Sequence, residues 1–148
     1  MKKIYIGSDH AGFELKEKLK PFVISLGYEV IDLGSGTYDS QDDYPDMCKP
    51  VAVAVANEAL SRGIVLGGSG QGEAIVANRV KGIRACVYYG GPLDIIALSR
   101  EHNDSNILSI GARMILESEA MEAVKLWLDR PFSGDERHVR RINKIDQE

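Results

Sequence analysis

The chain has 148 residues, of which 44% are hydrophobic and 27% are charged, the proportions of one globular domain of ordinary composition. Its formal net charge of −4 provides no overall positive field that would attract nucleic acid or an anionic membrane. No apolar run approaches the ~18 residues of a membrane span, and the N-terminus shows no secretory signal pattern. We therefore expect a cytoplasmic protein without nucleic-acid or membrane partners. Cys48 and Cys86 have no CxxC spacing and are expected to be free thiols.

Short apolar segments alternate with longer helical patterns along the chain. The first half predicts, in order, the strand Ile4–Gly7, the helix Ala11–Leu26, the strand Glu29–Leu33, the polar loop Gly34–Tyr44 and the helix Pro45–Leu60. The second half predicts the strand Gly63–Leu66, the helix Glu73–Val80, the strand Ile83–Tyr89, the helix Pro92–Glu101, the strand Ile107–Ile110, and the helices Glu117–Leu128 and Glu136–Ile145. Pro21 is expected to kink the first helix, and Pro50 argues against an unbroken second one.

Strands joined by helical crossovers predict an α/β fold with a five-stranded parallel sheet covered on both faces and an extra C-terminal helix, in one domain spanning residues 1–148. Ligands of such sheets bind beyond the carboxyl ends of the strands. The segments that leave these ends are Ser8–His10, Gly67–Gly72, Tyr89–Pro92 and Gly111–Arg113. We therefore expect the functional site at these segments.

The segment Gly67-Gly68-Ser69-Gly70-Gln71-Gly72-Glu73 connects a predicted strand to a predicted helix. Its glycines allow successive backbone N–H groups to converge, and the helix N-terminus behind them adds partial positive charge. Such a turn can bind a phosphate or a developing oxyanion; the alternative is a purely structural tight turn. No Lys follows as in a Walker A motif, and the glycine spacing differs from GxGxxG, which disfavours a nucleotide-dependent enzyme.

Glu73 ends this turn, where an acidic residue has an ordinary explanation as a favourable charge at a helix start. Beside an anion-binding turn, the same carboxylate can also remove a proton while the N–H groups stabilise the oxyanion that results. Isomerisation of an aldose to a ketose through an enediolate requires this pair of groups. It requires no metal or redox cofactor, and we predict none.

The C-terminal segment is basic, and Arg137 and Arg141 share one face of its predicted helix. Three interpretations stay open: a solvated charged face, a clamp for a phosphate group, and a weak nucleic-acid patch. The histidines, His10, His102 and His138, show no zinc-binding spacing, so we predict no metal site. Free imidazoles suit proton transfer or a hydrogen bond to phosphate.

Several strings occur together over almost the whole chain: Gly7-Ser8-Asp9-His10-Ala11-Gly12, Asp43-Tyr44-Pro45, the Gly67–Glu73 turn with Ala77-Asn78, Gly82-Ile83-Arg84-Ala85, Ser99-Arg100-Glu101-His102-Asn103-Asp104, and Arg137-His138-x-x-Arg141. In this order they resemble the type B ribose-5-phosphate isomerases, whose wider group includes allose-6-phosphate and galactose-6-phosphate isomerases. Many members carry a Cys as proton-shuttling base at the position of Gly67. The sequence resembles the other branch, in which a glutamate, here Glu73, is the base.

The resemblance implies a Rossmann-like three-layer α/β/α fold. It also implies a homo-oligomer, a dimer or a tetramer, whose sites for a phosphorylated sugar are shared between subunits. Glu73 would be the base, Ser69 would hydrogen-bond the enediolate, and Asp9 and His102 would serve ring opening. The substrate-binding residues implied by the resemblance are His10, Tyr44, Gly68, Gly70, Gln71, Gly72, Asn103, Arg113, Arg137 and Arg141. Of these, Tyr44 and Arg113 come from the resemblance alone.

The sequence is therefore compatible with three functions. The first is isomerisation of ribose 5-phosphate and ribulose 5-phosphate through a cis-enediolate. The second keeps this chemistry on a six-carbon sugar phosphate, allose 6-phosphate or galactose 6-phosphate. The third is a non-catalytic sugar-phosphate binding module, which the presence of Glu73, His102 and Asp9 beside an intact turn disfavours.

Overall fold

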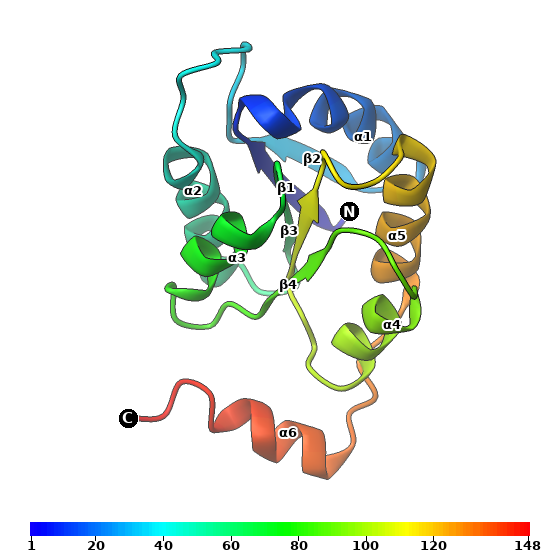
Figure 1. The fold of residues 1–148 in the computed structure, drawn as a ribbon. Coiled ribbons are helices and arrows are strands. Elements are labelled where there is room, and N and C mark those ends of the chain that lie inside the picture. Colours follow the sequence, from blue (N-terminus) through cyan, green and yellow to red (C-terminus); the bar gives the residue numbers. More distant parts are fainter.

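The computed structural model describes residues 1–148 and contains a five-stranded sheet with the strand order β2-β1-β3-β5-β4 (Figure 1). The strands are β1 (Lys3–Ser8), β2 (Glu29–Asp32), β3 (Arg62–Gly67), β4 (Ala85–Tyr88) and β5 (Ile107–Gly111). Every pairing between neighbouring strands is parallel. The predicted α/β fold with a five-stranded parallel sheet is thus confirmed.

Helices cover both faces of the sheet. They are α1 (Phe13–Ser25), α2 (Tyr44–Asn57), α3 (Gln71–Asn78), α4 (Asp94–Glu101), α5 (Glu117–Asp129) and α6 (Glu136–Asn143). Helices α1, α4 and α5 contribute to the larger apolar core on one face, and α2 and α3 contribute to the smaller core on the other. Figure 1 shows α6 standing apart from the sheet, below α3 and α4. None of these helices combines the length and the apolar composition needed to cross a lipid bilayer.

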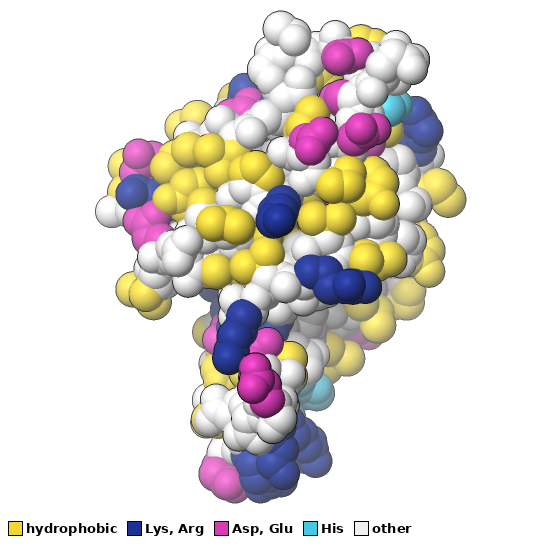
Figure 2. Space-filling view, turned by 90° about the vertical axis from the view of Figure 1, so that its left-hand side faces the viewer, with side chains coloured by type: hydrophobic (Ala, Val, Ile, Leu, Met, Phe, Trp, Pro, Cys, Tyr) yellow, Lys and Arg dark blue, Asp and Glu magenta, His cyan; other side chains and the backbone are white.

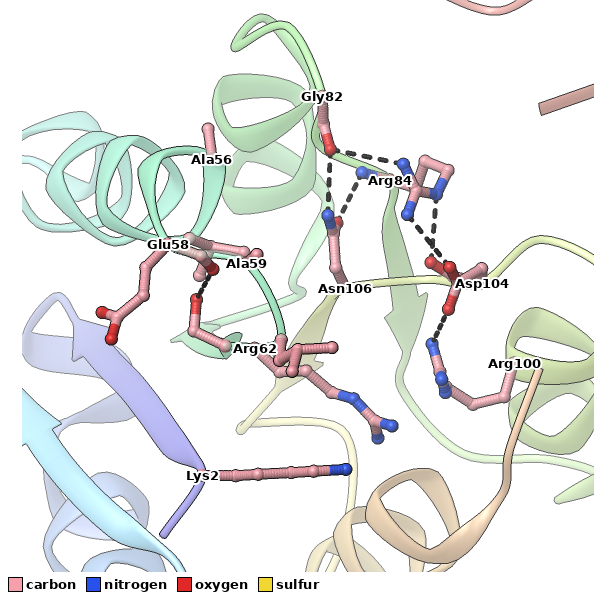
Figure 3. Close-up of a pocket in the computed structure, with 13 residues that line it drawn as sticks. Lys2, Ala56, Glu58, Ala59, Arg62, Gly82, Arg84, Arg100, Asp104 and Asn106 are labelled. Atoms are coloured by element: carbon pink, nitrogen blue, oxygen red, sulfur yellow. Dashed lines mark hydrogen bonds and ion pairs between the residues drawn. The ribbon is translucent and has the colours of Figure 1, made fainter. Parts of the chain in front are cut away.

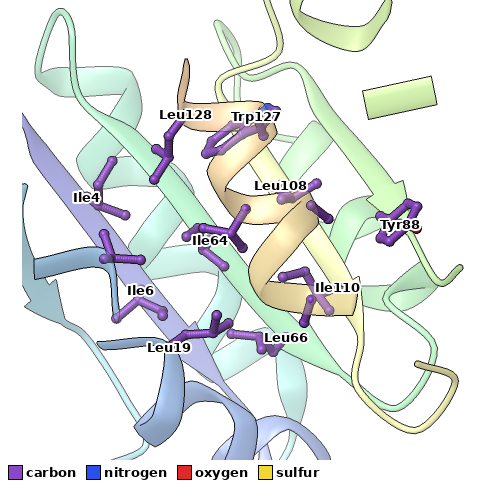
Figure 4. Close-up of a cluster of buried hydrophobic side chains, with 14 of the residues drawn as sticks. Ile4, Ile6, Leu19, Ile64, Leu66, Tyr88, Leu108, Ile110, Trp127 and Leu128 are labelled. Carbon is purple, nitrogen blue, oxygen red and sulfur yellow. The ribbon is translucent and has the colours of Figure 1, made fainter. Parts of the chain in front are cut away.

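The central strand β3 shows how the sequence builds both cores. Successive side chains of a strand point to opposite faces, so Ile64 and Leu66 pack into the larger core and Val65 packs into the smaller one. The larger core also contains the fully buried Trp127 of α5 (Figure 4). Burial of each such side chain contributes roughly 1.5–3 kcal/mol of transfer free energy. The carboxyl end of β3, where the glycine-rich turn begins, is therefore anchored on both sides.

Helix α2 runs unbroken through Pro50, against the expectation from the sequence. The physical reason is its close packing on the sheet, which two glycines permit. A Cβ atom added to Gly7 would lie 2.9 Å from Cγ2 of Val51, and one added to Gly63 would lie 2.8 Å from Cγ1 of the same side chain. This contact holds the helix together where Pro50 lacks a backbone N–H. Pro21 also lies inside a helix, α1, and the kink expected there stays a prediction.

The chain between β1 and α1 forms a short 3-10 helix, η1 (His10–Gly12), which the sequence pattern had merged with α1. Oδ1 of Asp9 caps it by accepting hydrogen bonds from the N–H groups of Ala11 at 3.0 Å and Gly12 at 3.3 Å. A Cβ atom on Gly12 would lie 2.5 Å from Cβ of Leu66, so glycine allows this segment to pack against the end of β3. Asp9 is thereby held beside the glycine-rich turn.

Candidate active site

The glycine-rich turn joins β3 to α3, and its path requires glycine at position 70. Gly70 has a φ of 79°, in the left-handed region, and a Cβ atom there would lie 3.1 Å from the backbone nitrogen of Gly111. Three hydrogen bonds fix the turn to the end of β5: Ala112 N–H to the Gly67 carbonyl (2.8 Å), Arg113 N–H to the Gly68 carbonyl (3.1 Å) and the Ser109 hydroxyl to the Gly70 carbonyl (2.6 Å).

With these carbonyls engaged, the turn keeps free N–H groups. Those of Ser69 and Gly72 have no hydrogen-bond acceptor within the chain. They lie at the N-terminus of α3, where the first N–H groups lack intrahelical partners and carry partial positive charge. The Oγ atom of Ser69 accepts a weak bond from Gln71 N–H at 3.3 Å, which leaves the hydroxyl hydrogen free to donate. The turn is therefore suited to stabilise an anionic oxygen.

The carboxylate of Glu73 folds back over the end of β3. The residue is only 4% exposed, although it is ionisable and lies in the first turn of α3. A Cβ atom on Gly67 would lie 1.6 Å from its Oε1 and 2.1 Å from its Cδ. The carboxylate thus fills the space that a side chain at position 67 would need.

Burial raises the pKa of Glu73, and the negative charge of Asp9 raises it further, while the backbone amides of Glu73 and Gly70 act in the opposite direction. A carboxylate with a raised pKa is a stronger base than an exposed one. Cys48 of α2 is fully buried, and this burial, followed by the charges of Glu73 and Asp9, raises the pKa of its thiol. The thiol therefore stays protonated, and Glu73 is the candidate base.

His10 is held by Asp42, which belongs to the loop between β2 and α2. Oδ1 of Asp42 accepts two hydrogen bonds from His10, one from the backbone N–H at 3.0 Å and one from ring Nδ1 at 2.7 Å. The Asp42 side chain is 6% exposed, and its Oδ2 has no partner. Donation from Nδ1 leaves Nε2 as the ring atom that can contact a ligand. Asp42 was not among the residues predicted from the sequence, because an aspartate near Asp39 and Asp43 in a polar loop gives no signal.

Asp9, His10 and Asp42 are also the one group of acidic and imidazole side chains with ligand atoms close enough for a metal, within 4.8 Å of one another. Nδ1 of His10 and Oδ1 of Asp42 are, however, engaged with each other, and Oδ1 of Asp9 caps η1. The arrangement is that of a hydrogen-bonded acid–imidazole pair beside a helix cap. The absence of a metal site stays a prediction.

Tyr44 and Arg113 both lie against the turn. A Cβ atom on Gly72 would lie 2.6 Å from Cζ of Tyr44 and 2.9 Å from its Oη, so the phenol reaches the start of α3. A Cβ atom on Gly68 would lie 3.4 Å from Nη1 of Arg113. The carboxyl ends of the strands thus bring together the glycines of the turn and seven other predicted residues: Asp9, His10, Tyr44, Ser69, Gln71, Glu73 and Arg113.

His102 and Asn103 lie at the opposite end of the strands, the amino end. They follow α4 and come shortly before β5 begins, whereas Arg113 comes shortly after β5 ends. The strand contains five residues, which at ~3.3 Å per residue separate its ends by about 16 Å. Within one chain, His102 and Asn103 therefore do not join the group around Glu73.

Helix α6 lies on the same side as His102. The ring centroids of His102 and His138 are 4.3 Å apart, and His138 is the one buried residue of α6. Arg137 and Arg141 are exposed, and neither forms an ion pair. The second group of predicted residues is therefore His102, Asn103, Arg137 and Arg141, and the structure separates it from the first. Of the predicted residues, only the first group lies at the carboxyl ends of the strands.

Comparison with known proteins identifies the family. Residues 4–145 match the family described as Ribose/Galactose Isomerase. The chain is 42% identical over 141 residues to the ribose-5-phosphate isomerase B of Mycobacterium tuberculosis (strain CDC 1551 / Oshkosh), an alignment that covers 95% of this chain and 86% of that protein.

Solved structures agree in fold. The ribose-5-phosphate isomerase B of Clostridium thermocellum has a TM-score of 0.90 at 45% identity, over 97% of this chain and 94% of that one. The ribose-5-phosphate isomerase B of Mycoplasma genitalium, solved with bound ribulose-5-phosphate, has a TM-score of 0.91 at 37% identity, over 97% and 93% of the two chains. The resemblance in the sequence is confirmed, and the chain belongs to the ribose/galactose isomerase family of enzymes.

Proposed function

We propose that the chain interconverts ribose 5-phosphate and ribulose 5-phosphate. The names of its relatives and the ribulose-5-phosphate bound to the Mycoplasma genitalium enzyme support this substrate. The observation that carries the mechanism is the buried carboxylate of Glu73 beside the unpaired N–H groups of Ser69 and Gly72. A base next to an anion-binding turn is the arrangement that an enediolate intermediate requires.

The reaction starts with opening of the sugar ring, served by Asp9 and His102. Glu73 then removes the proton from C2, and the electron pair moves so that negative charge develops on the C1 oxygen. The N–H groups of the turn and the hydroxyl of Ser69 stabilise this charge. Return of the proton to C1, with transfer of the O2 hydrogen to O1, gives the ketose. The proton shuttles within one site, so atoms balance without a redox partner.

The location of the Glu73 carboxylate, next to Gly67, supports its assignment as the base. In relatives with a Cys there, the thiolate would project from the end of β3. In this chain the Glu73 carboxylate fills that same space, 1.6 Å from where Cβ of residue 67 would be. A different residue thus delivers a base to the same place beside the turn.

The complete site contains residues from two subunits. His102, Asn103, Arg137 and Arg141 lie about the length of a strand away from Glu73 in their own chain. Arg137 and Arg141 are exposed cations without acidic partners, on a helix that stands apart from the sheet (Figure 1). A second copy whose α6 reaches the glycine-rich turn would place these guanidinium groups near Arg113 and His10, around the phosphate.

The surface over α2 and α3 supports this assembly. Figure 2 shows hydrophobic side chains gathered on this face, interrupted by a few basic ones. Val53 is 41% exposed and Ile75 is 58% exposed, and an apolar groove lined by Leu33, Pro45, Pro50 and Val53 runs along α2. Apolar patches of this kind are typical of surfaces that another chain covers. The face adjoins Tyr44 and α3, so the partner would arrive beside the active site.

A substrate panel tests the proposal. We expect kcat/KM for ribose 5-phosphate to exceed that for allose 6-phosphate and galactose 6-phosphate, with EDTA leaving turnover unchanged. Exchange of the C2 proton of bound substrate with deuterated solvent should accompany turnover. A higher kcat/KM for a six-carbon phosphate would transfer the proposal to that sugar, and binding with neither exchange nor conversion to a ketose would exclude an isomerase.

A further inference from the structure

A cavity of about 310 Å³ opens at the amino ends of the strands, opposite the end that carries the glycine-rich turn (Figure 3). It is bounded by the C-terminal end of α2, the start of β3, the segment leading into β4 and the segment leading into β5. Its volume is at the lower end of the range of small-molecule sites. None of the residues proposed above for catalysis or sugar binding lines it.

The lining carries an excess of positive charge, in a protein whose formal net charge is −4. Four cationic side chains line the cavity, Lys2, Arg62, Arg84 and Arg100, against two acidic ones, Glu58 and Asp104. Glu58 is already engaged outside the cavity by the Tyr5 hydroxyl and by the Lys3 ammonium at 2.9 Å.

Asp104 is shared between two arginines. It lies 2.8 Å from Nη1 of Arg100 and 3.5 Å from Nη2 of Arg84. No acidic side chain remains to pair with Lys2 or Arg62, and neither takes part in an ion pair. The unbalanced charge of the cavity therefore lies on these two groups.

The guanidinium of Arg62 is held in a fixed position. Its Nη1 donates to the carbonyl of Trp127 at 2.9 Å and to that of Leu128 at 3.3 Å, and its Cζ lies 5.3 Å from the centroid of the Trp127 ring. Nε and Nη2 have no such acceptor and remain available. Burial lowers the pKa of Arg62, and the nearby charge of Arg100 lowers it further. Figure 3 shows the amine of Lys2 extending toward this guanidinium.

We propose that this cavity binds a small phosphorylated metabolite, with the phosphate group between Lys2 and the free side of Arg62. A planar guanidinium grips two phosphate oxygens, and an ammonium contacts a third. The apolar wall of the cavity, which includes Val55, Ala59 and Leu60, accommodates a compact carbon skeleton. The bound anion also offsets the repulsion between Arg62 and Arg100. This site is separate from the active site and does not depend on the function proposed for it.

The probe is inorganic phosphate. Its binding is monitored through the amide chemical shifts of the ¹⁵N-labelled full chain, at constant ionic strength and with chloride as the reference anion. Phosphate binding in the cavity is expected to shift the amides of Leu60, Ser61 and Arg62, which line it. Binding in the active site would instead shift those of the turn, residues 68–72, so one titration separates the two sites. Shifts confined to the turn, or absent altogether, overturn the proposal.

Variants test the assignment to Lys2. Lys2→Gln removes one charge-assisted contact and should weaken phosphate binding in the cavity about tenfold. Lys2→Glu places a carboxylate beside Arg62 and should abolish the cavity shifts. The control Lys125→Gln makes the same charge change on the exposed face of α5, where Lys125 pairs with Asp129, and should leave the affinity within about twofold. Equal weakening by Lys2→Gln and Lys125→Gln would show diffuse surface attraction and would overturn the site.

Discussion

The proposed site has two halves, one at the carboxyl ends of the strands and one beyond their amino ends. The two halves differ in how each is built. At the carboxyl ends of the strands, charged groups are buried and held by the chain itself: Glu73 is 4% exposed and Asp9 is 7% exposed. Beyond the amino ends, Arg137 and Arg141 are exposed and unpaired on a helix apart from the sheet. In the proposed mechanism, the first half is organised in advance to move a proton. The second half consists of charge without a local partner, which is what a subunit contributing to a neighbour would present.

The largest effect is expected at the base. Glu73→Gln should lower kcat by ~10²–10⁴-fold, because proton transfer by a positioned group contributes about this much. Sugar-phosphate binding, measured by calorimetry, should change little, and Glu14→Gln, at an exposed position of α1, is the matched control. Turnover retained by Glu73→Gln would remove Glu73 from the mechanism and sharpen the search for another base at the same end of the strands.

Glu73→Gln should also change how the stability of the protein depends on pH. The pKa of Glu73 is raised in the folded state, so the folded protein binds more protons than the unfolded one above the ordinary glutamate pKa. Stability therefore falls as pH rises from about 4.5 through the folded-state pKa. Glu73→Gln removes this loss, and its melting temperature relative to wild type should rise between pH 4 and pH 8. A relative decrease over that range would show that the buried carboxylate is stabilised, not strained, by its surroundings.

A substitution at position 67 tests whether the Glu73 carboxylate must keep its position for activity. Gly67→Ala puts a methyl group where the Glu73 carboxylate lies, so the carboxylate must move, and kcat should fall by ~10²-fold or more. Gly36→Ala adds the same methyl group in open space and should leave activity unchanged. A fully active Gly67→Ala would mean that the carboxylate adopts another position during catalysis.

Mixing subunits tests whether the two halves come from different chains. Glu73→Gln and the double variant Arg137→Ala/Arg141→Ala are each expected to be strongly impaired, the second mainly through a raised KM. Co-refolding equal amounts should restore about a quarter of wild-type activity. Half of the dimers are then mixed, and one of their two sites is intact. No recovery, although mixed dimers form, would place the arginines in the same chain as their Glu73.

The smallest effect is expected at Asp42. Asp42→Asn keeps an acceptor for the backbone N–H of His10 but removes the charge that faces ring Nδ1. The ring then loses its fixed orientation, and we expect KM to rise by roughly 3–10-fold with kcat nearly constant. Asp43→Asn, at the exposed neighbouring position, is the control. A fall in kcat without a change in KM would assign the His10–Asp42 pair to proton transfer.

Sequence patterns indicated where most of the first half lies in the fold and did not indicate where the second half lies, for physical reasons. The turn was visible because closely spaced glycines and a following acid have few structural uses, and β3 ends where its apolar run ends. Tyr44 and Arg113 needed the family resemblance, since each is unremarkable in its local sequence. Asp42 left no signal, because its partner His10 is distant in the chain. The separation of His102 from Glu73 follows from the parallel sheet, because His102 precedes the strand β5 whereas Glu73 follows the strand β3.

The tight fit between Gly67 and Glu73 limits how such an enzyme changes over generations. An ancestor with a thiol at one position cannot acquire the carboxylate at the other while both keep their places, because the two side chains would overlap. An intermediate with glycine at 67 and no glutamate at 73 has neither base, and one with both is sterically crowded. In the proposed mechanism, a change of base therefore requires changes at both positions, and a descendant that alters one of the two residues is expected to alter the other.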